Sequence, residues 1–477
     1  MSTCSRRKFI SRTGSGLLAA ALFNDMNNLL AAQTEKGIAP AGPGSKYVPG
    51  IKAAVVRRAE EYGMRWPGQV YDGREAQKNY CRQASAAAAE LGLELDLSST
   101  EINSPDQADA WIARAVKDKA DGLLIILLDR QEHAWPTVVK AADSGIPIVV
   151  FAPLGTAFTT NTMDLAHRDG LFICSTDDFN QAVYGLKMLK AIAKLREMRF
   201  VVIRGRERND TRLGFFGTRL RYVPAGDFLD EYNRTPETEE IRKISADYIR
   251  RATRIWGASE QDVLNGVKSF VVSRSILVRE QADGITMDCL GALGATKVSL
   301  PCISWARMND SGVPAACEAD LGACVTHALV QLLFDRPGFQ QDPVPETSKN
   351  LLIGSHCCCP TRLNGFSQPP EPYYISHHHG MRDAVPRTVW KTGQRATVAD
   401  VILQQNGPPE MVISAGEVVD NPAVPPAGGC VVAVSLKLDG MTEPLAYPGF
   451  HQLFFYGDYA QELKNYCKLA GIKPVVI

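Results

Sequence analysis

Short apolar runs alternate with longer amphipathic stretches over residues 51–203, and this alternation constrains the fold more than any other feature. The apolar runs have the length of β-strands and lie at 53–56, 93–97, 122–128, 146–151, 171–174 and 200–203. Stretches with helical spacing separate them at 74–91, 106–119, 134–143 and 179–195. Such alternation predicts a parallel sheet that is covered by helices on both faces.

A second α/β unit is predicted over residues 204–354, with helices near 237–256 and 259–269. Beyond it Pro and Gly become frequent, and short apolar runs occur at 373–375, 397–403, 410–415, 430–436 and 453–456, before a helix at 459–469. We therefore predict an α/β protein with two flavodoxin-like α/β domains (51–203 and 204–354) and a mainly β, barrel-like C-terminal domain (355–477).

The first residues differ in kind from the rest of the chain. Arg6 and Arg7 precede an apolar run at 17–23 and small residues at 31–32. This pattern is typical of a twin-arginine signal peptide over residues 1–32, followed by a linker at 33–50, and it predicts export to the periplasm. No other segment approaches the roughly 18 apolar residues that a membrane span needs, so we expect no membrane association after signal removal.

The charge balance argues against nucleic acid as a partner. Lys and Arg total 52, and Asp and Glu also total 52, so the chain has no net charge to attract a polyanion. The twelve cysteines follow no disulfide framework, and residues 357–359 (CCC) lack the paired spacing of a zinc site.

Two carboxylates, Glu318 and Asp320, lie between a predicted strand at 313–317 and a predicted helix. Ligands of open α/β sheets bind outside the carboxyl ends of the strands, which favours a functional role. Either carboxylate would equally suit an N-cap of the helix. His451, beside aromatic strand residues, likewise suits either a metal ligand or a core imidazole. The residues alone leave these alternatives open.

Four segments resemble, in order, motifs of the L-fucose isomerase and L-arabinose isomerase superfamily. They are 301–323, which contains CEAD; 354–360 (GSHCCCP), similar to HC-x-x-P; 376–379 (SHHH), similar to a later H-x-E-S strand without its carboxylate; and 449–458, similar to the closing G-N-H segment. This resemblance implies an aldose–ketose isomerase that binds a small-molecule sugar and a divalent metal, and the oxygen and histidine ligands favour manganese. It also implies a homo-trimer or homo-hexamer.

The resemblance assigns roles to individual residues. It implies that Asp320 and His451 bind the metal and that Asp320 also takes part in catalysis with Glu318 or Asp288. On the same basis His356 and Trp305 are expected to contact the sugar.

Two departures weaken the resemblance. Ala292 stands where the family has a glutamate that binds metal and moves a proton, and Phe450 stands where it has an asparagine. Alanine does neither, so Asp288 would have to substitute. The alternative hypothesis is an exported, non-catalytic sugar-binding protein, which also agrees with the binding-protein-like segments at 120–126 and 145–151.

Overall fold

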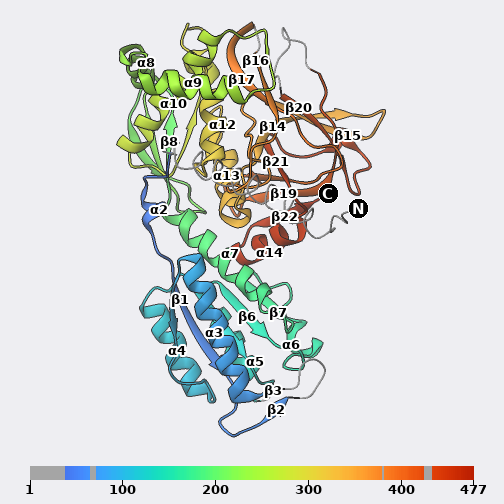
Figure 1. Ribbon diagram of the computed structural model, residues 1–477. Helices are drawn as coiled ribbons and strands as arrows, with labels where there is room; N and C mark the ends of the chain where they lie inside the picture. Colours follow the sequence, from blue (N-terminus) through green and yellow to red (C-terminus); the bar gives the residue numbers. More distant parts are fainter. Residues whose placement is uncertain (1–37, 65–70, 131, 379–380, 424–431) are drawn as a thin grey trace, which may run out of the picture. The chain divides into compact units, whose positions relative to one another are not determined.

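The computed structural model describes residues 38–64, 71–130, 132–378, 381–423 and 432–477 (Figure 1). It separates residues up to Ala39 from a unit that runs from Pro40 to Ile477, and every element below belongs to this second unit. The predicted signal peptide lies outside the described residues, as does part of the linker. Within the described ranges, none of the helices combines the length and apolar character that crossing a bilayer requires.

The first sheet is parallel throughout and has five strands. In order they are β4 (Glu94–Leu97), β1 (Gly50–Val56), β5 (Gly122–Leu127), β6 (Ile148–Ala152) and β7 (Leu171–Ser175). β5 and β6 are buried along their whole length, as expected for a sheet that is covered on both faces. The predicted strands at this end of the chain are therefore confirmed.

Four helices pack on this sheet. α3 (Gly73–Leu91) and α7 (Asn180–Glu197) share one core with it, and α4 (Pro105–Lys117) and α5 (Ala134–Asp143) share the other (Figure 1). α7 approaches closely because Gly185 has no side chain: a Cβ there would lie 2.6 Å from a methyl group of Val149. Short elements complete this part: α2 (Pro43–Lys46), β2 (Gly63–Met64), β3 (Tyr71–Asp72) and α6 (Thr159–Thr162).

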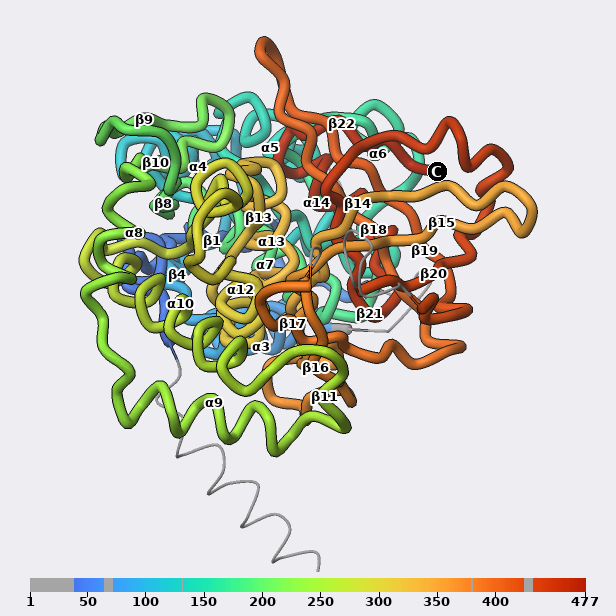
Figure 2. The backbone as a smooth tube through the Cα atoms, turned by 90° about the horizontal axis from the view of Figure 1, so that it is seen from above, coloured from blue at the N-terminus to red at the C-terminus, as the bar shows by residue number. Residues whose placement is uncertain are grey.

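The second sheet is mixed. Its order is β13 (Ala315–Cys317), β12 (Gly284–Met287), β8 (Arg199–Ile203), β10 (Arg219–Val223) and β9 (Asn209–Arg212), and only β9 is antiparallel to its neighbour. β8, which the prediction placed with the first domain, pairs here. The helices of this region are α8 (Ala225–Arg234), α9 (Glu239–Arg251), α10 (Glu260–Arg279), α11 (Cys289–Leu293) and α12 (Cys302–Asp310), and α10 contacts both α9 and α12 (Figure 2).

The third sheet is mainly antiparallel and has seven strands. Its order is β18 (Arg395–Ile402), β21 (Gln452–Tyr456), β14 (Phe339–Glu346), β15 (Leu351–His356), β20 (Val432–Leu438), β19 (Glu410–Asp420) and β22 (Lys473–Val476). β18 also pairs with β19, so the hydrogen-bonded order returns to its first strand. A smaller sheet contains β11 (Ile255–Trp256), β16 (Tyr373–His378) and β17 (Arg382–Thr388).

Two further helices pack against the third sheet. α13 (Leu321–Phe334) contacts β18 as well as α7, and α14 (Ala460–Ala470) contacts β19 and β22; a 3-10 turn covers Pro444–Ala446. The mixed α/β class is confirmed, whereas the predicted domain boundaries stay predictions. β14 had no sequence signal because its residues, FQQDPVPE, include no apolar run.

A buried aspartate joins the start of the described chain to the second sheet. The carboxylate of Asp283 is fully buried and accepts hydrogen bonds from the backbone N–H groups of Gly44 (2.9 Å), Ser45 (2.7 Å) and Arg199 (2.9 Å). Gly42 passes so close that a Cβ there would lie 2.2 Å from a carboxylate oxygen of Asp283. The segment around α2 is therefore held to the start of β8 by one side chain.

Replacing this aspartate should destabilise the protein strongly. Asp283→Ala leaves three N–H groups without their acceptor, and we expect the free energy of unfolding to fall by about 3–5 kcal/mol in urea titrations. Asp106→Ala, which removes an exposed carboxylate from the first turn of α4, should cost less than about 1 kcal/mol. Equal losses in the two variants would contradict this role of Asp283.

Candidate functional site

Five side chains converge where the second and third sheets meet, and we call them the acid–histidine cluster: Glu318, Asp320, Asp342, His356 and His451. Glu318 and Asp320 follow the carboxyl end of β13, as predicted. Asp342 lies on β14, His356 is the last residue of β15, and His451 directly precedes β21.

Strand pairing explains why these distant residues meet. β14 lies between β15 and β21, with Asp342 opposite Ser355 on one side and Gln341 opposite Gln452 on the other. Asp342 is therefore adjacent to both histidines, because each is one residue from a paired position. The two imidazole rings lie with their centroids 5.5 Å apart, edge to face.

The Nε2 atoms of both histidines face carboxylate oxygens. His451 Nε2 lies 3.5 Å from Glu318 Oε2 and 3.4 Å from Asp342 Oδ1, and His356 Nε2 lies 3.9 Å from Glu318 Oε1 and 4.0 Å from Asp342 Oδ1. The histidine side chains are 1% and 5% exposed, whereas the carboxylates are 30–34% exposed. Solvent therefore reaches the cluster from the carboxylate side.

Asp320 has two tasks in this arrangement. Its Oδ1 accepts from the Ala323 N–H and caps α13, and its Oδ2 lies 2.9 Å from His451 Nδ1. Both roles that the sequence left open are thus combined: Asp320 is an N-cap, and its second oxygen orients His451. His451 Nε2 is left pointing at Glu318 and Asp342.

Burial and charge oppose each other in the pKa values. Burial alone would lower the pKa of His451, but the close carboxylates of Asp320 and Glu318 outweigh it and raise the pKa to about 10. For Asp320, burial is outweighed by His451 and by the Ala323 N–H, so its pKa is lowered. The pKa of Glu318 is lowered chiefly by His451, whereas burial raises the pKa of Asp342.

The backbone around the cluster adopts an unusual conformation. Glu318, Ala319 and His451 have φ values of 63°, 56° and 52°, in the left-handed region that non-glycine residues rarely adopt. Each such residue costs about 1 kcal/mol or more and persists only where its surroundings hold it. Here the Ala319 N–H donates to the Met287 carbonyl (2.9 Å), and Asp320 holds the His451 ring.

The other predicted residues have different surroundings. Asp288 caps α11 by accepting from the Gly291 N–H at 3.2 Å. Trp305 is fully buried in α12 and offers no surface to a sugar, so we do not include it in the site. Asp342 was not predicted, because β14 carries no apolar run that would have marked it as a strand; only its first three residues are buried.

The cluster has the donor set of a divalent metal site. Metal–ligand bonds of about 2.1 Å separate neighbouring ligand atoms by about 3.0–3.5 Å, and the four separations of 3.4–4.0 Å need only a small contraction. Neither His356 Nε2 nor His451 Nε2 has a hydrogen-bond partner within the described part of the chain. Two buried ring nitrogens of this kind, facing two carboxylates, fit a cation between them.

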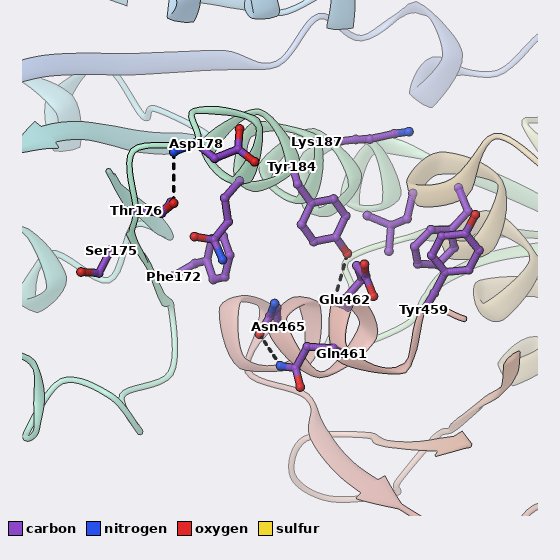
Figure 3. Close-up of a pocket in the computed structure, with 13 residues that line it drawn as sticks. Phe172, Ser175, Thr176, Asp178, Tyr184, Lys187, Tyr459, Gln461, Glu462 and Asn465 are labelled. Atoms are coloured by element: carbon purple, nitrogen blue, oxygen red, sulfur yellow. Dashed lines mark hydrogen bonds between the residues drawn. The ribbon is translucent and has the colours of Figure 1, made fainter. Parts of the chain in front are cut away.

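A second candidate region is an open pocket of about 690 Å³ between β7, α7, α13 and α14 (Figure 3). It shares no residue with the acid–histidine cluster. Its polar groups largely bond to one another: Tyr184 donates to the Glu462 carbonyl at 3.0 Å, and Gln461 donates to Asn465 at 3.1 Å. We therefore regard the cluster, with its unmatched ring nitrogens, as the stronger candidate.

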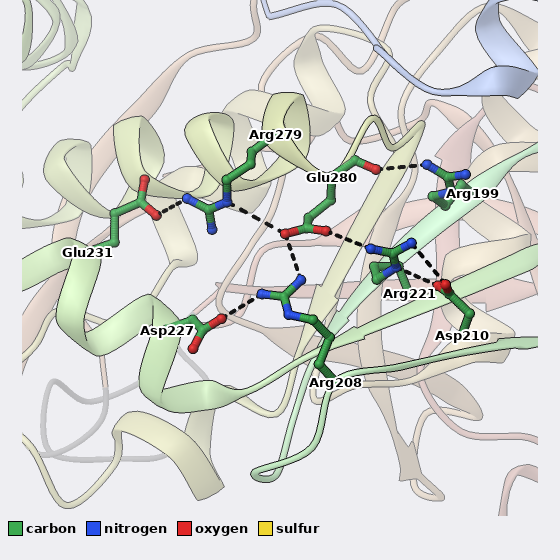
Figure 4. A network of polar contacts seen from close by, with 8 residues as sticks. All are labelled: Arg199, Arg208, Asp210, Arg221, Asp227, Glu231, Arg279 and Glu280. Atoms are coloured by element: carbon green, nitrogen blue, oxygen red, sulfur yellow. Dashed lines mark hydrogen bonds and ion pairs between the residues drawn. The ribbon is translucent and has the colours of Figure 1, made fainter.

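A charged cluster around Glu280 has a structural role (Figure 4). Arg208 and Arg221 contact the two carboxylate oxygens of Glu280 at 2.8 and 3.2 Å, and Arg279 lies 3.6 Å away. These arginines also pair with Asp227, Asp210 and Glu231. The charges therefore join the strands of the second sheet to α8 and α10.

Comparison with known proteins finds little. No family model matches the sequence, and no curated protein matches it. Similar solved structures are solute-binding proteins. One is a periplasmic solute-binding protein of an ABC transporter from Actinobacillus succinogenes 130z with bound D-allose, at 12% identity over 60% of this chain and 91% of that chain, with a TM-score of 0.20.

Two other similar structures are also ligand-binding proteins. GanP, a glucose–galactose binding protein from Geobacillus stearothermophilus, is 14% identical over 61% of this chain and 92% of its own, with a TM-score of 0.20. The solute-binding protein of a 5-methylthioribose transporter from Thermotoga lettingae TMO is 12% identical over 62% and 83%, with a TM-score of 0.19. Similarity this low carries no conclusion about what this chain binds.

These findings correct the predicted membership of the L-fucose isomerase superfamily and the isomerase activity with it. No family model supports the isomerase motifs, and the solved structures named above are described as solute- or sugar-binding proteins and not as isomerases. The physical reason is that each motif is short and that Ala292 already removes the acid on which the reaction depends. The trimer or hexamer was implied only by that resemblance, and we do not carry it further.

The raised pKa of His451 predicts a pH dependence of stability in the metal-free protein. Because the pKa rises from 6.5 unfolded to about 10 folded, its stabilising effect is complete below pH 6.5 and is lost as the pH rises through 10. Wild type should therefore exceed His451→Asn in free energy of unfolding by up to a few kcal/mol at pH 6, and the gap should close toward pH 10. Urea titrations with a chelator would measure this, and a gap that is independent of pH would contradict it.

Proposed function

We propose that the protein binds a divalent metal ion and holds a small polyhydroxylated molecule of the sugar class on it, without converting it. Glu318, Asp342, His356 and His451 are the proposed ligands, and manganese is the first candidate because the donors are carboxylate oxygens and imidazoles. The observation that carries the proposal is the convergence of two buried, unmatched Nε2 atoms on two carboxylates. Export to the periplasm remains our prediction from the first residues.

Asp320 is proposed to orient a ligand, since its Oδ2 lies on His451 Nδ1 and its Oδ1 caps α13. A carboxylate behind a metal-bound histidine fixes the ring and keeps the Nδ1 proton in place. This proposal replaces the direct ligand role that the sequence suggested for Asp320.

Two features favour a sugar-like molecule. Neighbouring hydroxyl groups offer a metal ion two oxygens, and the partly exposed carboxylates of Glu318 and Asp342 leave the metal open to solvent. Phe450 is 59% exposed, and its ring centroid lies 4.5 Å from that of His451. An exposed aromatic ring beside polar groups suits the apolar face of a sugar ring.

Binding without conversion is proposed because the glutamate that the isomerase resemblance requires is replaced by Ala292, and the acids and histidines of the cluster are assigned to holding or orienting the metal. Ala292 cannot act as an acid or base, and Asp288, the substitute that the sequence offered, is used to cap α11. Proton transfer between carbons needs a titratable group within hydrogen-bond reach of the substrate.

Metal affinity should separate the ligands from the orienting residue. We expect calorimetric titration with Mn²⁺ to give one site per chain, His451→Ala to abolish it, and Asp320→Asn to weaken it by about 10–100-fold. Asp72→Asn is the matched control, because Asp72 caps α3 in the same way but lies elsewhere. Unchanged affinity in His451→Ala would refute the proposed metal site.

Sugar binding should then depend on the metal. In thermal unfolding with a panel of monosaccharides, a ligand at 100 times its Kd should add about 2.7 kcal/mol of stability, and only in the manganese-loaded protein. Phe450→Ala should weaken this effect but leave Mn²⁺ affinity unchanged, whereas Phe215→Ala, at another exposed phenylalanine, should change neither. Conversion of an aldose to a ketose would disprove the non-catalytic part of the proposal.

A further inference from the structure

Five buried thiols gather directly behind His356, and we call them the thiol cluster: Cys289, Cys302, Cys317, Cys357 and Cys358. They are between 1% and 6% exposed, and all are free thiols. They come from the start of α11, the start of α12, the end of β13 and the segment after β15. None of them has a role in the function proposed above.

The contacts inside the thiol cluster are continuous. Cys317 Sγ lies 3.4 Å from Cys358 Sγ, and the sulfur atoms of Cys302 and Cys357 lie within 4.8 Å of each other. The neighbouring thiols of Cys302 and Cys317 lower the pKa of Cys357, and those of Cys289 and Cys357 raise the pKa of Cys317. The five thiols therefore influence one another.

Two histidines complete the donor set. Cys302, Cys357 and His378 each offer one ligand atom, and these three atoms lie within 4.8 Å of one another. The same holds for Cys317, Cys358 and His356. His356 Nδ1 lies 3.4 Å from Cys357 Sγ and 3.8 Å from Cys358 Sγ, so the Nδ1 edge of this ring faces the thiols.

The spacing suits a thiophilic metal ion. Zn–S bonds of about 2.3 Å in a tetrahedral site place neighbouring ligand atoms about 3.5–3.8 Å apart, which is within the observed limit. Thiolate and imidazole donors select zinc(II) or copper(I), whereas carboxylates favour harder ions such as manganese. The two donor sets of this region therefore differ in chemistry, and His356 lies between them.

We propose that the thiol cluster binds a thiophilic metal ion, zinc(II) or copper(I), through Cys302, Cys357 and His378. Binding replaces the thiol protons, which leave to solvent, and involves no change of oxidation state. His356 is not a ligand of this ion: its Nε2 faces the acid–histidine cluster, and its Nδ1 lies 3.4 Å from the sulfur of Cys357. This metal site differs from the acid–histidine cluster, and its proposal does not rest on the proposed sugar function.

No local motif indicates this site, because its donors are far apart in the chain. Residues 357–359 lack paired spacing, and the remaining donors belong to α12 and β16. The short distance between the thiols also favours a bound ion. Free thiols 3.4 Å apart in an oxidising compartment, where the signal sequence predicts this protein to act, would otherwise be poised to form a disulfide.

Cobalt substitution tests the proposal on the full chain. Protein purified under reducing conditions should contain zinc or copper at one equivalent by elemental analysis, and Co²⁺ in its place should give the absorption of thiolate-to-cobalt charge transfer. Cys302→Ser and Cys357→Ser should lose this absorption and weaken the metal on the order of a hundredfold. Cys467→Ser is the matched control, because Cys467 is buried in α14 beside Met411, and it should keep the absorption.

Two further results separate this site from the sugar site. His451→Ala should lose manganese but keep the cobalt–thiolate absorption. Each proposal can therefore fail without affecting the test of the other. If Cys302→Ser unfolds, thiol modification of folded wild-type protein with and without chelator gives the same information, since a bound ion should slow the modification. The proposal is overturned if no thiolate absorption develops, if Cys302→Ser keeps it, or if intact mass shows a Cys317–Cys358 disulfide in the purified protein.

Discussion

His356 is a fully buried imidazole whose two nitrogens face different chemical environments, and the functional region depends on this constraint. Nε2 faces the carboxylates of Glu318 and Asp342, and Nδ1 faces the sulfur atoms of Cys357 and Cys358. A neutral ring carries one proton, so binding a cation on one side requires the proton to stay on the other. The pKa of His356 records this conflict: burial would lower it, but Cys357 and Asp342 raise it.

The acid–histidine cluster gathers more carboxylates than imidazoles in a region that is closed on one side by the third sheet. Unpaired negative charge is costly in such surroundings, and a cation supplies the missing counter-charge. Burial therefore destabilises the cluster without an ion and favours the binding of a cation. Strained backbone at Glu318, Ala319 and His451 is retained because these residues must reach a common point from different strands.

The sequence predicts the α/β part well because its strands and helices carry strong, regular apolar periodicity. It fails for β14, where a polar strand lies between β15 and β21 and carries Asp342. Glu318, Asp320, His356 and His451, which the sequence singled out as candidates, lie together in the structure, since acids at a strand end and isolated histidines are visible locally. Their roles were not visible, because orienting and ligating residues differ only in which atom faces which neighbour. Short motifs were a poor guide to family, because a match of a few residues does not show which atom of each side chain faces which neighbour.

The donors of the acid–histidine cluster are separated by long stretches of chain, and this has a consequence for how the protein matures. Glu318 precedes every strand of the third sheet in the chain, whereas His451 follows all of them except β21 and β22. β21 lies between β14 and β18, and this position brings His451 to Asp320. The proposed metal ligands therefore come together only once the C-terminal strands of the sheet are in place.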